Sequence, residues 1–506
     1  MKISKETYRN KVRGCWMGKN IGGTLGAPFE AVRVSADIDF YTENLSKGVL
    51  PNDDLDLQLA FLNAAERFGK AVDAKILAEY WVTAITPNWA EYGVGKTNLR
   101  LGLQPPVSGG FVNHYKDSNG AWIRSELWAC LMPGHPELAV RYAYQDAIVD
   151  HADEGVYAEV FTAALESAAF AESDPDRLME AALSYIPQDC GVAQAVKLVV
   201  QCKKEGLNWK EARHRLLMEI PDSFGQQLHS PNPENFPDAT WGYDAPANIG
   251  IVILGWLYGE GDFGKSICIA AGCGEDGDCT TATLGAVLGI ILGADAIPEK
   301  WVEPIGEEIK TCSLNIRTSA VEIPETITEL TDRVCRLMPS FIPEYFDMFQ
   351  NGEEVELFSG EQLYDHPFRR WMIKPFEFKD EYPKSYATFT GENTLLKMEV
   401  TAASGIKIRE GEVCELDLHA ENIMGFVGNQ LWLQLRWLLP EGWSIDTGTQ
   451  TAMFLGQYHC DIGHAYSKAR ITVGPVKEPV TTIVLEISPH DRPNKLYIPI
   501  QLVCAV

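Results

Sequence analysis

The stretch DGDCTTATLGAVLGIILGA, residues 276–294, decides the fold. With helical spacing, its small residues share one face and its large aliphatic residues the other: Ala282, Gly285, Ala286 and Gly289 against Leu284, Val287, Leu288 and Ile291. Such a helix is expected to be buried on both sides. Its start would then carry the carboxylates of Asp276 and Asp278 into the interior or into a cleft, where charges need partners.

A bound cation is the simplest compensation for these two carboxylates. No lysine or arginine lies between Lys265 and Lys300 to neutralise them locally. Oxygen ligands of this kind suit Mg²⁺, Mn²⁺ or Ca²⁺ better than zinc. The sequence therefore predicts a divalent-metal site at the start of this helix.

A second acidic cluster, Asn52-Asp53-Asp54, directly precedes a helical pattern that begins at Leu55. Asparagine and aspartate are good helix caps, and acidic groups in a first turn are stabilised by the helix dipole. Capping alone is enough to explain this cluster. Metal binding is the alternative, and it requires that the two clusters meet in the folded chain.

The whole chain limits the possible partners. It has 506 residues, 46% of them hydrophobic, and 43 Lys and Arg against 70 Asp and Glu, a formal charge of −27. That charge repels DNA and RNA over most of the surface.

Met1–Asn20 lacks the apolar core of a secretory signal, and the apolar stretch Thr280–Ala294 falls short of the roughly 20 residues that cross a bilayer. We expect a cytoplasmic protein with no nucleic-acid or membrane partner; its oligomeric state stays open.

The hydrophobic period changes once along the chain. Residues 1–337 show helical spacing, and 338–382 mix aromatic, proline and acidic residues as in a linker packed against a domain. Residues 383–506 contain period-two runs separated by Gly and Pro turns. The prediction is a multidomain α and β protein: an all-α domain followed by a small antiparallel β-sandwich.

Three ordered motifs now resemble one family, the ADP-ribosylglycohydrolases. Gly22-Gly23-Thr24-Leu25-Gly26-Ala27-Pro28-Phe29-Glu30 is similar to the family's Gly-Asp-x-x-Gly-x-Pro-x-Glu signature. Asn52-Asp53-Asp54 resembles its Thr-Asp-Asp, and Asp276-Gly277-Asp278-Cys279 its Asp-x-Asp-Thr. Asp150-His151, followed by Gly155, is similar to a histidine motif that the family has in the middle of its sequence. The resemblance covers about residues 8 to 300.

The resemblance implies an orthogonal all-α fold that holds two Mg²⁺-type ions, Mg²⁺ or Mn²⁺, between the acidic clusters. Glu30 would match the mobile glutamate near the metals, and His151 would lie near the sugar. The implied metal ligands are Asn52, Asp53, Asp54, Asp276, Asp278 and Cys279.

Three positions depart from the family pattern. Asn52 replaces the first threonine and can still offer an amide oxygen. Cys279 replaces the last threonine with a soft ligand that a hard cation would not prefer. Gly23 replaces the early aspartate. These changes bear on substrate identity more than on metal binding.

Two further features have competing interpretations. Gly259–Ser266 fits the P-loop pattern and includes Lys265, but its acidic residues and the missing βα alternation favour a turn between two helices. Trp89 and Asn98 lie in a polar, glycine-rich region that could line a sugar pocket, although tryptophans are core residues by default.

The leading hypothesis is a metal-dependent glycohydrolase that cleaves at the anomeric carbon of ADP-ribose or a related sugar, on a small molecule or an ADP-ribosylated substrate. A non-ADP-ribose glycoside or nucleoside is an alternative substrate. A metal-dependent binder without turnover, or a P-loop nucleotidase, is an alternative function.

Overall fold

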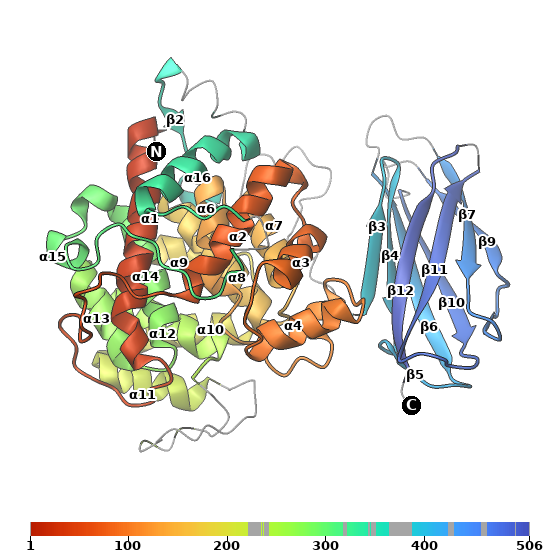
Figure 1. Ribbon diagram of the computed structural model, residues 1–506, viewed down its shortest axis with the longest axis horizontal. Helices are drawn as coiled ribbons and strands as arrows, with labels where there is room; N and C mark the ends of the chain where they lie inside the picture. Colours follow the sequence, from red (N-terminus) through yellow and green to blue (C-terminus); the bar gives the residue numbers. More distant parts are fainter. Residues whose placement is uncertain are drawn as a thin grey trace. The chain divides into compact units, whose positions relative to one another are not determined.

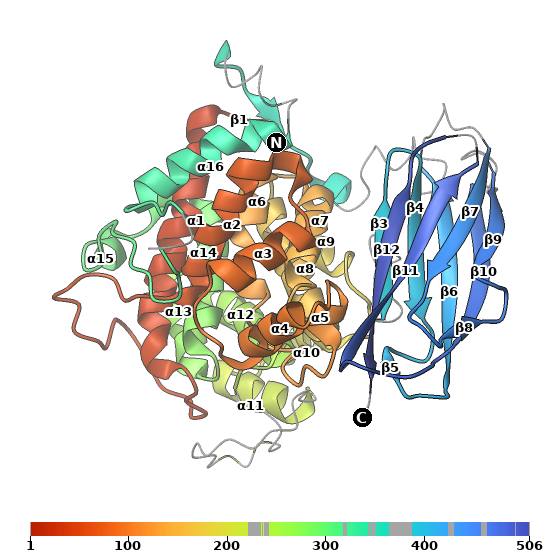
Figure 2. The same cartoon turned by 45° about the vertical axis from the view of Figure 1, so that its right-hand side comes forward.

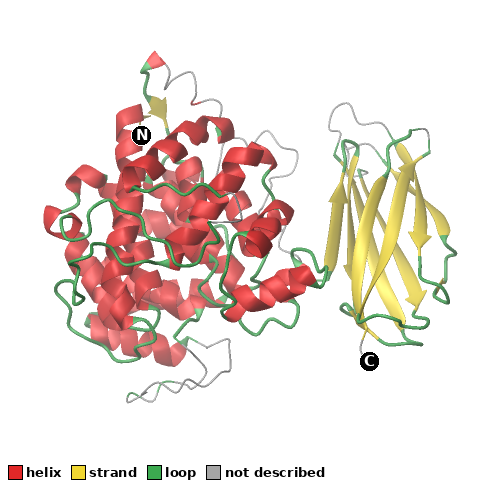
Figure 3. Cartoon of the chain, viewed as in Figure 1, coloured by secondary structure: helices red, strands yellow, loops and turns green. Residues whose placement is uncertain are grey.

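The computed structural model describes residues 2–220, 234, 236, 242–316, 321–342, 345, 351–363, 387–423, 430–456, 463–490 and 492–504. The chain forms two compact units. The first contains Met1–Lys96 and Val112–Tyr382, and the second contains Thr97–Phe111 and Pro383–Val506. The predicted helical domain with a C-terminal β-rich domain is confirmed (Figure 3).

The first unit is almost entirely helical. Its α-helices, including α4 that leads out of it, are α1 Lys5–Gly26, α2 Asp53–Phe68, α3 Ala74–Thr83, α4 Ala90–Arg100, α6 Glu126–Leu131, α7 Pro136–Ala147, α8 Glu154–Ala169, α9 Pro175–Leu183, α10 Gly191–Glu205, α11 Trp209–Glu219, α12 Ala245–Gly259, α13 Phe263–Cys273, α14 Gly277–Leu292, α15 Glu299–Val302 and α16 Ile327–Phe341. Short 3₁₀ turns are η1 Ala27–Phe29, η2 Gly69–Ala71, η3 Trp122–Arg124, η4 Ala294–Ala296 and η6 Gly360–Leu363. Within the described ranges, no helix is both long and apolar enough to cross a membrane.

Helices α1 and α14 run side by side through this unit (Figures 1 and 2). Glycines recur once per turn along α1, and a Cβ on any of them would overlap the backbone of α14. The paired positions are Gly14 with Gly289, Gly18 with Gly285, Gly22 with Thr281, and Gly26 with Gly277. The small face of α14 is therefore the surface on which α1 lies. Because the pair is antiparallel, the end of α1 meets the start of α14.

A short strand pair also belongs to the first unit. Strand β1 (Lys2–Ile3) pairs antiparallel with β2 (Val355–Glu356). Close by in the chain, the Leu363 carbonyl accepts a hydrogen bond from the Tyr185 hydroxyl. These contacts tie part of the predicted linker, 338–382, to the helical unit; residues 364–382 of that linker lie outside the described residues.

The second unit contains two five-stranded sheets, ordered β3-β4-β6-β10-β8 and β5-β12-β11-β7-β9. All their strand pairs are antiparallel apart from β5 with β12. The strands are β3 Thr388–Glu392, β4 Leu396–Ala402, β5 Lys407–Ile408, β6 Val413–Asn422, β7 Leu431–Leu438, β8 Ser444–Ile445, β9 Gln450–Leu455, β10 His464–Thr472, β11 Val480–Pro489 and β12 Leu496–Cys504. Burial alternates along β7, as expected for a strand with one face in a core.

The segment Thr97–Phe111 belongs to this second unit, although the sequence analysis assigned it to the helical domain. It carries the short helix α5 (Val107–Gly110). Leu103 and Val107 are buried in the same hydrophobic core as the strands. The second unit is thus completed by a segment from early in the chain.

Candidate metal centre

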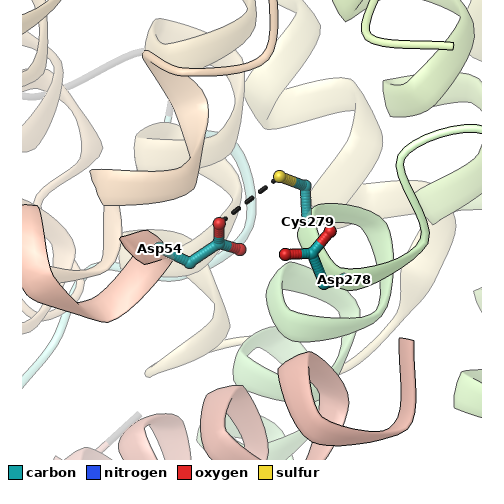
Figure 4. Close-up of side chains that lie close together, drawn as sticks. All are labelled: Asp54, Asp278 and Cys279. Atoms are coloured by element: carbon teal, nitrogen blue, oxygen red, sulfur yellow. Dashed lines mark hydrogen bonds between the residues drawn. The ribbon is translucent and has the colours of Figure 1, made fainter. Parts of the chain in front are cut away.

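The two acidic clusters meet where α2 and α14 begin. One ligand atom each from Asp54, Asp278 and Cys279 lie within 4.8 Å of one another (Figure 4). A second such group contains Glu30, Asp276 and Asp278. Asp278 is common to both groups, so the arrangement offers two adjacent positions that share one carboxylate. This geometry can hold divalent metal ions.

The two helix starts differ in what their first residues do. Asn52 caps α2, since its Oδ1 accepts a 2.8 Å hydrogen bond from the amide of Asp54. Asp276 occupies the same position on α14, but its side chain makes no capping bond. Instead, its Oδ2 accepts a hydrogen bond of 2.8 Å from Nδ2 of Asn119. The capping interpretation therefore holds for Asn52, whereas the Asp276 side chain does not cap its helix.

A backbone link between two distant segments holds Glu30 beside the second cluster. The amide of Ala31 donates to the carbonyl of Glu275 (2.7 Å), and the amide of Glu275 donates to the carbonyl of Val32 (2.9 Å). Ala31 and Glu275 both have positive φ angles, 57° and 60°. Non-glycine residues in this region are strained and concentrate at functional sites. The strained pair lies directly next to Glu30 and Asp276.

Burial raises the pKa of several carboxyl groups in the centre. Burial and the Asp278 charge raise the pKa of Glu30 to about 7 and that of Asp53 to about 6. The pKa values of Asp54 and Asp276 are also raised, first by burial. Removal from water and mutual repulsion both disfavour the charged forms. The described positive charge near the centre is therefore too small to keep all of these carboxyl groups at their ordinary pKa values.

Two buried carboxylate oxygens of the centre could serve as metal ligands. Asp54 is 1% exposed and Asp278 is 8% exposed. Oδ2 of Asp54 and Oδ1 of Asp278 have no hydrogen-bond partner among the described residues. Buried carboxylate oxygens are normally bonded. A divalent ion fits these residues because it would satisfy both oxygens.

One cation that the sequence analysis missed lies close by. Nζ of Lys19, on α1, is 4.0 Å from Oδ2 of Asp54 and 2.6 Å from Oε1 of Glu126. The shorter contact makes Glu126 its main partner, so Lys19 neutralises Asp54 only in part. Lys19 is one of two buried lysines on α1, and nothing in the sequence distinguished it from Lys11.

Three loop and helix residues complete the surroundings. The sequence analysis placed Tyr92 in the region that could line a sugar pocket and gave Asn119 and Tyr243 no role. The Tyr92 hydroxyl donates to Oδ2 of Asp53 (3.0 Å), and the Tyr243 hydroxyl donates to Oε1 of Glu30 (3.2 Å). Asn119 holds Asp276, as described. No local pattern marks these residues, because their roles depend on segments that meet only in the fold.

His151 is fully buried beside the centre. Its Nε2 lies 2.9 Å from Oγ of Ser118, and its Nδ1 lies 3.0 Å from Oδ1 of Asp150. Arg124 holds the same carboxylate at 2.6 Å. Ser118 precedes Asn119, so the histidine is connected to the residue that bonds Asp276. Its predicted contact with a sugar stays a prediction.

The two other predicted substrate contacts, Trp89 and Asn98, differ in whether they connect to the acidic centre. Trp89 is 55% exposed, and its ring centroid lies 6.1 Å from that of Tyr92, which bonds Asp53. Asn98 lies in the second unit, where its amide nitrogen donates to the carbonyls of Ser108 and Phe111. Trp89 thus connects to the centre through one residue, whereas Asn98 fastens its own loop.

The two departures at positions 23 and 52 occur together in space. A Cβ at Gly23 would overlap Nδ2 of Asn52. The asparagine amide therefore occupies the room that a side chain at position 23 would need. The two departures from the family pattern are therefore sterically coupled in this chain.

The P-loop pattern lies between α12 and α13. Asp262 caps α13 through the amide of Lys265 (2.6 Å), and Nζ of Lys265 pairs with Glu260 at 2.8 Å. A P-loop needs a strand before the loop and a free lysine for the phosphates. The segment has the predicted alternative structure, a turn between helices.

Comparisons with known proteins bear on this centre. A family model described as ADP-ribosylglycohydrolase matches residues 4–340. No curated protein matches the chain. Among solved structures, a chain described as "ADP-ribosylglycohydrolase-related protein complex" is 18% identical with a TM-score of 0.42; the match covers 67% of this chain and 99% of that one.

Proposed function

Because the chain belongs to the ADP-ribosylglycohydrolase family, we propose that it is a metal-dependent hydrolase that cleaves a glycosidic bond at the anomeric carbon of ADP-ribose or a related sugar. The observation that carries the proposal is the convergence of the two acidic clusters around a shared Asp278. Buried carboxylate oxygens without partners support it.

The residues proposed to hold Mg²⁺ or Mn²⁺ come from both helix starts. They are Asn52, Asp53, Asp54, Asp276, Asp278 and Cys279, as the family resemblance implies. When bound, two such ions would supply the positive charge that orients vicinal sugar hydroxyls and acidifies an attacking water. The amide of Asn119 and the hydroxyl of Tyr92 would keep Asp276 and Asp53 in place.

Glu30 is the proposed acid–base residue. In the metal-free chain, burial and the Asp278 charge raise the pKa of Glu30 to about 7. Its carboxyl group lies beside Asp276 and Asp278, where it could exchange a proton with a water molecule at the metal centre. In hydrolysis it would take a proton from the attacking water as the water oxygen bonds to the anomeric carbon. It would then return that proton to the leaving group, whose bond to the same carbon breaks. The Tyr243 hydroxyl would fix the orientation of Glu30 during this transfer.

Trp89 is the proposed aromatic contact for the substrate. Its exposed ring lies beside Tyr92, whose hydroxyl bonds Asp53. Flat aromatic faces suit both adenine rings and the apolar faces of sugars. An ADP-ribosylated small molecule or protein offers both, so ADP-ribose is the preferred substrate class.

A substrate screen tests this function. The full chain, freed of metal by a chelator, is incubated with ADP-ribosylated compounds and aryl glycosides, with and without Mg²⁺ or Mn²⁺. We expect release of ADP-ribose that needs the metal and disappears in Glu30→Gln. Lys265→Ala is the matched control and should turn over normally.

Each other result points to a different function. Turnover of aryl glycosides alone would replace ADP-ribose with another glycoside. Metal-dependent binding of ADP-ribose without turnover by any substrate would indicate a binding protein. Nucleotide hydrolysis abolished by Lys265→Ala would favour a nucleotidase and contradict the proposal.

A further inference from the structure

The group formed by Asp54, Asp278 and Cys279 differs chemically from its neighbour. It offers a sulfur atom, whereas the group of Glu30, Asp276 and Asp278 offers only oxygen. The thiol of Cys279 is 7% exposed, and its Sγ lies 3.4 Å from Oδ1 of Asp54 (Figure 4). The sulfur thus faces the ligand atoms rather than the hydrophobic core.

Two independent observations make this group a built site. The buried Oδ2 of Asp54 and Oδ1 of Asp278 lack hydrogen-bond partners among the described residues. Lys19, which is 4.0 Å from Asp54, has its shorter contact with Glu126. Among the described residues, these two oxygens are therefore available as ligand atoms beside the Cys279 sulfur.

We propose that the two metal positions are chemically unequal, and that the position of Asp54, Asp278 and Cys279 selects a thiophilic divalent ion. The ion would bond to the Cys279 sulfur as the thiol releases its proton to water. Thiolate ligands favour ions such as Zn²⁺, Co²⁺ and Cd²⁺, whereas carboxylates favour Mg²⁺ and Mn²⁺. The neighbouring all-oxygen position keeps the harder ion.

This inference rests on the proposed function, because it takes the acidic centre to be a metal site. It adds a consequence for that function. A soft ion binds its ligands more tightly and polarises bound water more strongly than Mg²⁺. Purified enzyme would then need the softer ion at one position for full occupancy, and Mg²⁺ alone would fill only the other.

The test uses cobalt as a spectroscopic probe on the full chain, stripped of metal and titrated with Co²⁺. Visible d–d absorption reports that Co²⁺ is bound. Sulfur-to-cobalt charge transfer in the near ultraviolet reports a bond to a thiolate. We expect both bands in the unmodified protein, and only the visible band in Cys279→Ser.

The matched control is Cys268→Ser, since this cysteine is also buried but belongs to neither ligand group. It should keep both bands. Calorimetry measures the affinity for each ion. Loss of a residue that only supports a metal ligand weakens binding by about tenfold or more, so loss of the Cys279 sulfur itself should weaken Cd²⁺ binding by more than about tenfold in Cys279→Ser. Mn²⁺ binding should change less. Cys279→Thr should behave like the serine variant.

The outcomes separate the inference from the proposed function. Bound Co²⁺ without a charge-transfer band overturns the sulfur bond and leaves the metal centre intact. A band that survives in folded Cys279→Ser also overturns it. If no divalent ion binds the unmodified protein, the metal-dependent function falls together with the inference. Since the band is read on the unmodified protein, a variant that fails to fold leaves this test in place.

Discussion

The hydroxyl of Tyr243 donates a 3.2 Å hydrogen bond to Oε1 of Glu30, which joins the segment before α12 to the segment after α1. Burial and the Asp278 charge raise the pKa of Glu30 to about 7, and this hydrogen bond opposes them. We expect Tyr243→Phe to raise that pKa further. The acid limb of Mn²⁺ affinity against pH should then move up by about half to one pH unit.

Calorimetric titrations with Mn²⁺ at several pH values measure this limb. Tyr80→Phe is the control, because the Tyr80 hydroxyl bonds Asn63 and not the acidic centre. An unchanged limb in folded Tyr243→Phe would show that the hydroxyl does not stabilise the charged form of Glu30.

The metal-free protein should lose stability as pH rises. The pKa values of Glu30 and Asp56 are raised to about 7 and that of Asp53 to about 6, in each case first by burial. In the unfolded chain they return to about 4, so between about pH 4 and 7 the folded state holds more protons. The free energy of unfolding contributed by these groups therefore falls as pH rises through that window.

Divalent metal should reverse this loss, because it binds the deprotonated carboxylates of the folded state only. Thermal unfolding at about pH 5 and 8, with and without Mg²⁺, measures both effects. The rise caused by metal should be larger at the higher pH and absent in Asp276→Asn/Asp278→Asn. Full metal occupancy of that double variant would refute the assignment of the centre.

Removal of the Trp89 ring should weaken substrate binding. Stacking of a base on an aromatic ring contributes about 1 to 3 kcal/mol, so Trp89→Ala should raise KM for an ADP-ribosylated substrate by about five- to a hundredfold. We expect kcat to change little, since the ring lies two contacts from Asp53. Trp432→Ala, at an exposed tryptophan of the second unit, is the control for the steady-state assay. Equal KM values in the two variants would remove Trp89 from the site.

A single methyl group between α1 and α14 should destabilise the first unit severely. A Cβ at Gly18 would overlap the carbonyl of Gly285, and neither helix backbone can shift without breaking the neighbouring glycine contacts. We expect Gly18→Ala to cost about 3 kcal/mol or more in the free energy of unfolding.

The control for this change is Gly206→Ala. Gly206 ends α10 with a φ of 81° and has open space where a Cβ would lie. Its substitution should cost only the conformational penalty of about 1 to 2 kcal/mol. Denaturant unfolding compares the two, and similar losses would show that the helix pair yields to a methyl group.

Deletion of residues 383–506 should leave the metal centre intact but reduce solubility. The centre is formed entirely by the first unit. Leu103 and Val107 would lose the core in which they are buried. We expect a truncated protein in which Leu103 and Val107 are changed to serine to bind Mn²⁺ like the full chain. Loss of metal binding in a soluble, folded truncation would show that the second unit supports the centre.

The sequence predicts the helix from Gly277 to Leu292 well, together with the two carboxylates at its start that need a compensating positive charge. Its small and large faces follow directly from helical spacing, and a buried N-terminus with two carboxylates restricts the possible partners. The change of period near residue 383 likewise predicts the β-rich unit. These features are local, so the sequence contains all the information that they need.

The remaining features depend on contacts between distant segments. Lys19, Asn119 and Tyr243 reach the centre only because α1, the loop before η3 and the start of α12 converge there. The prediction for Asn98 rested on a polar neighbourhood in sequence, while the fold commits its amide to its own loop. The glycines that recur once per turn along α1 form the surface that packs against the small face of α14.

The pairing of α1 with α14 also sets the order in which this protein can mature. The thiol of Cys279 and the carboxylate of Asp54 are 225 residues apart in the chain. During synthesis, the glycine ridge of α1 emerges long before the surface that covers it. Until α14 has been made, the ridge cannot pack against it, and Asp54 of α2 cannot meet Asp278 and Cys279. The ribosome must therefore release more than half of the polypeptide before the two acidic clusters can meet.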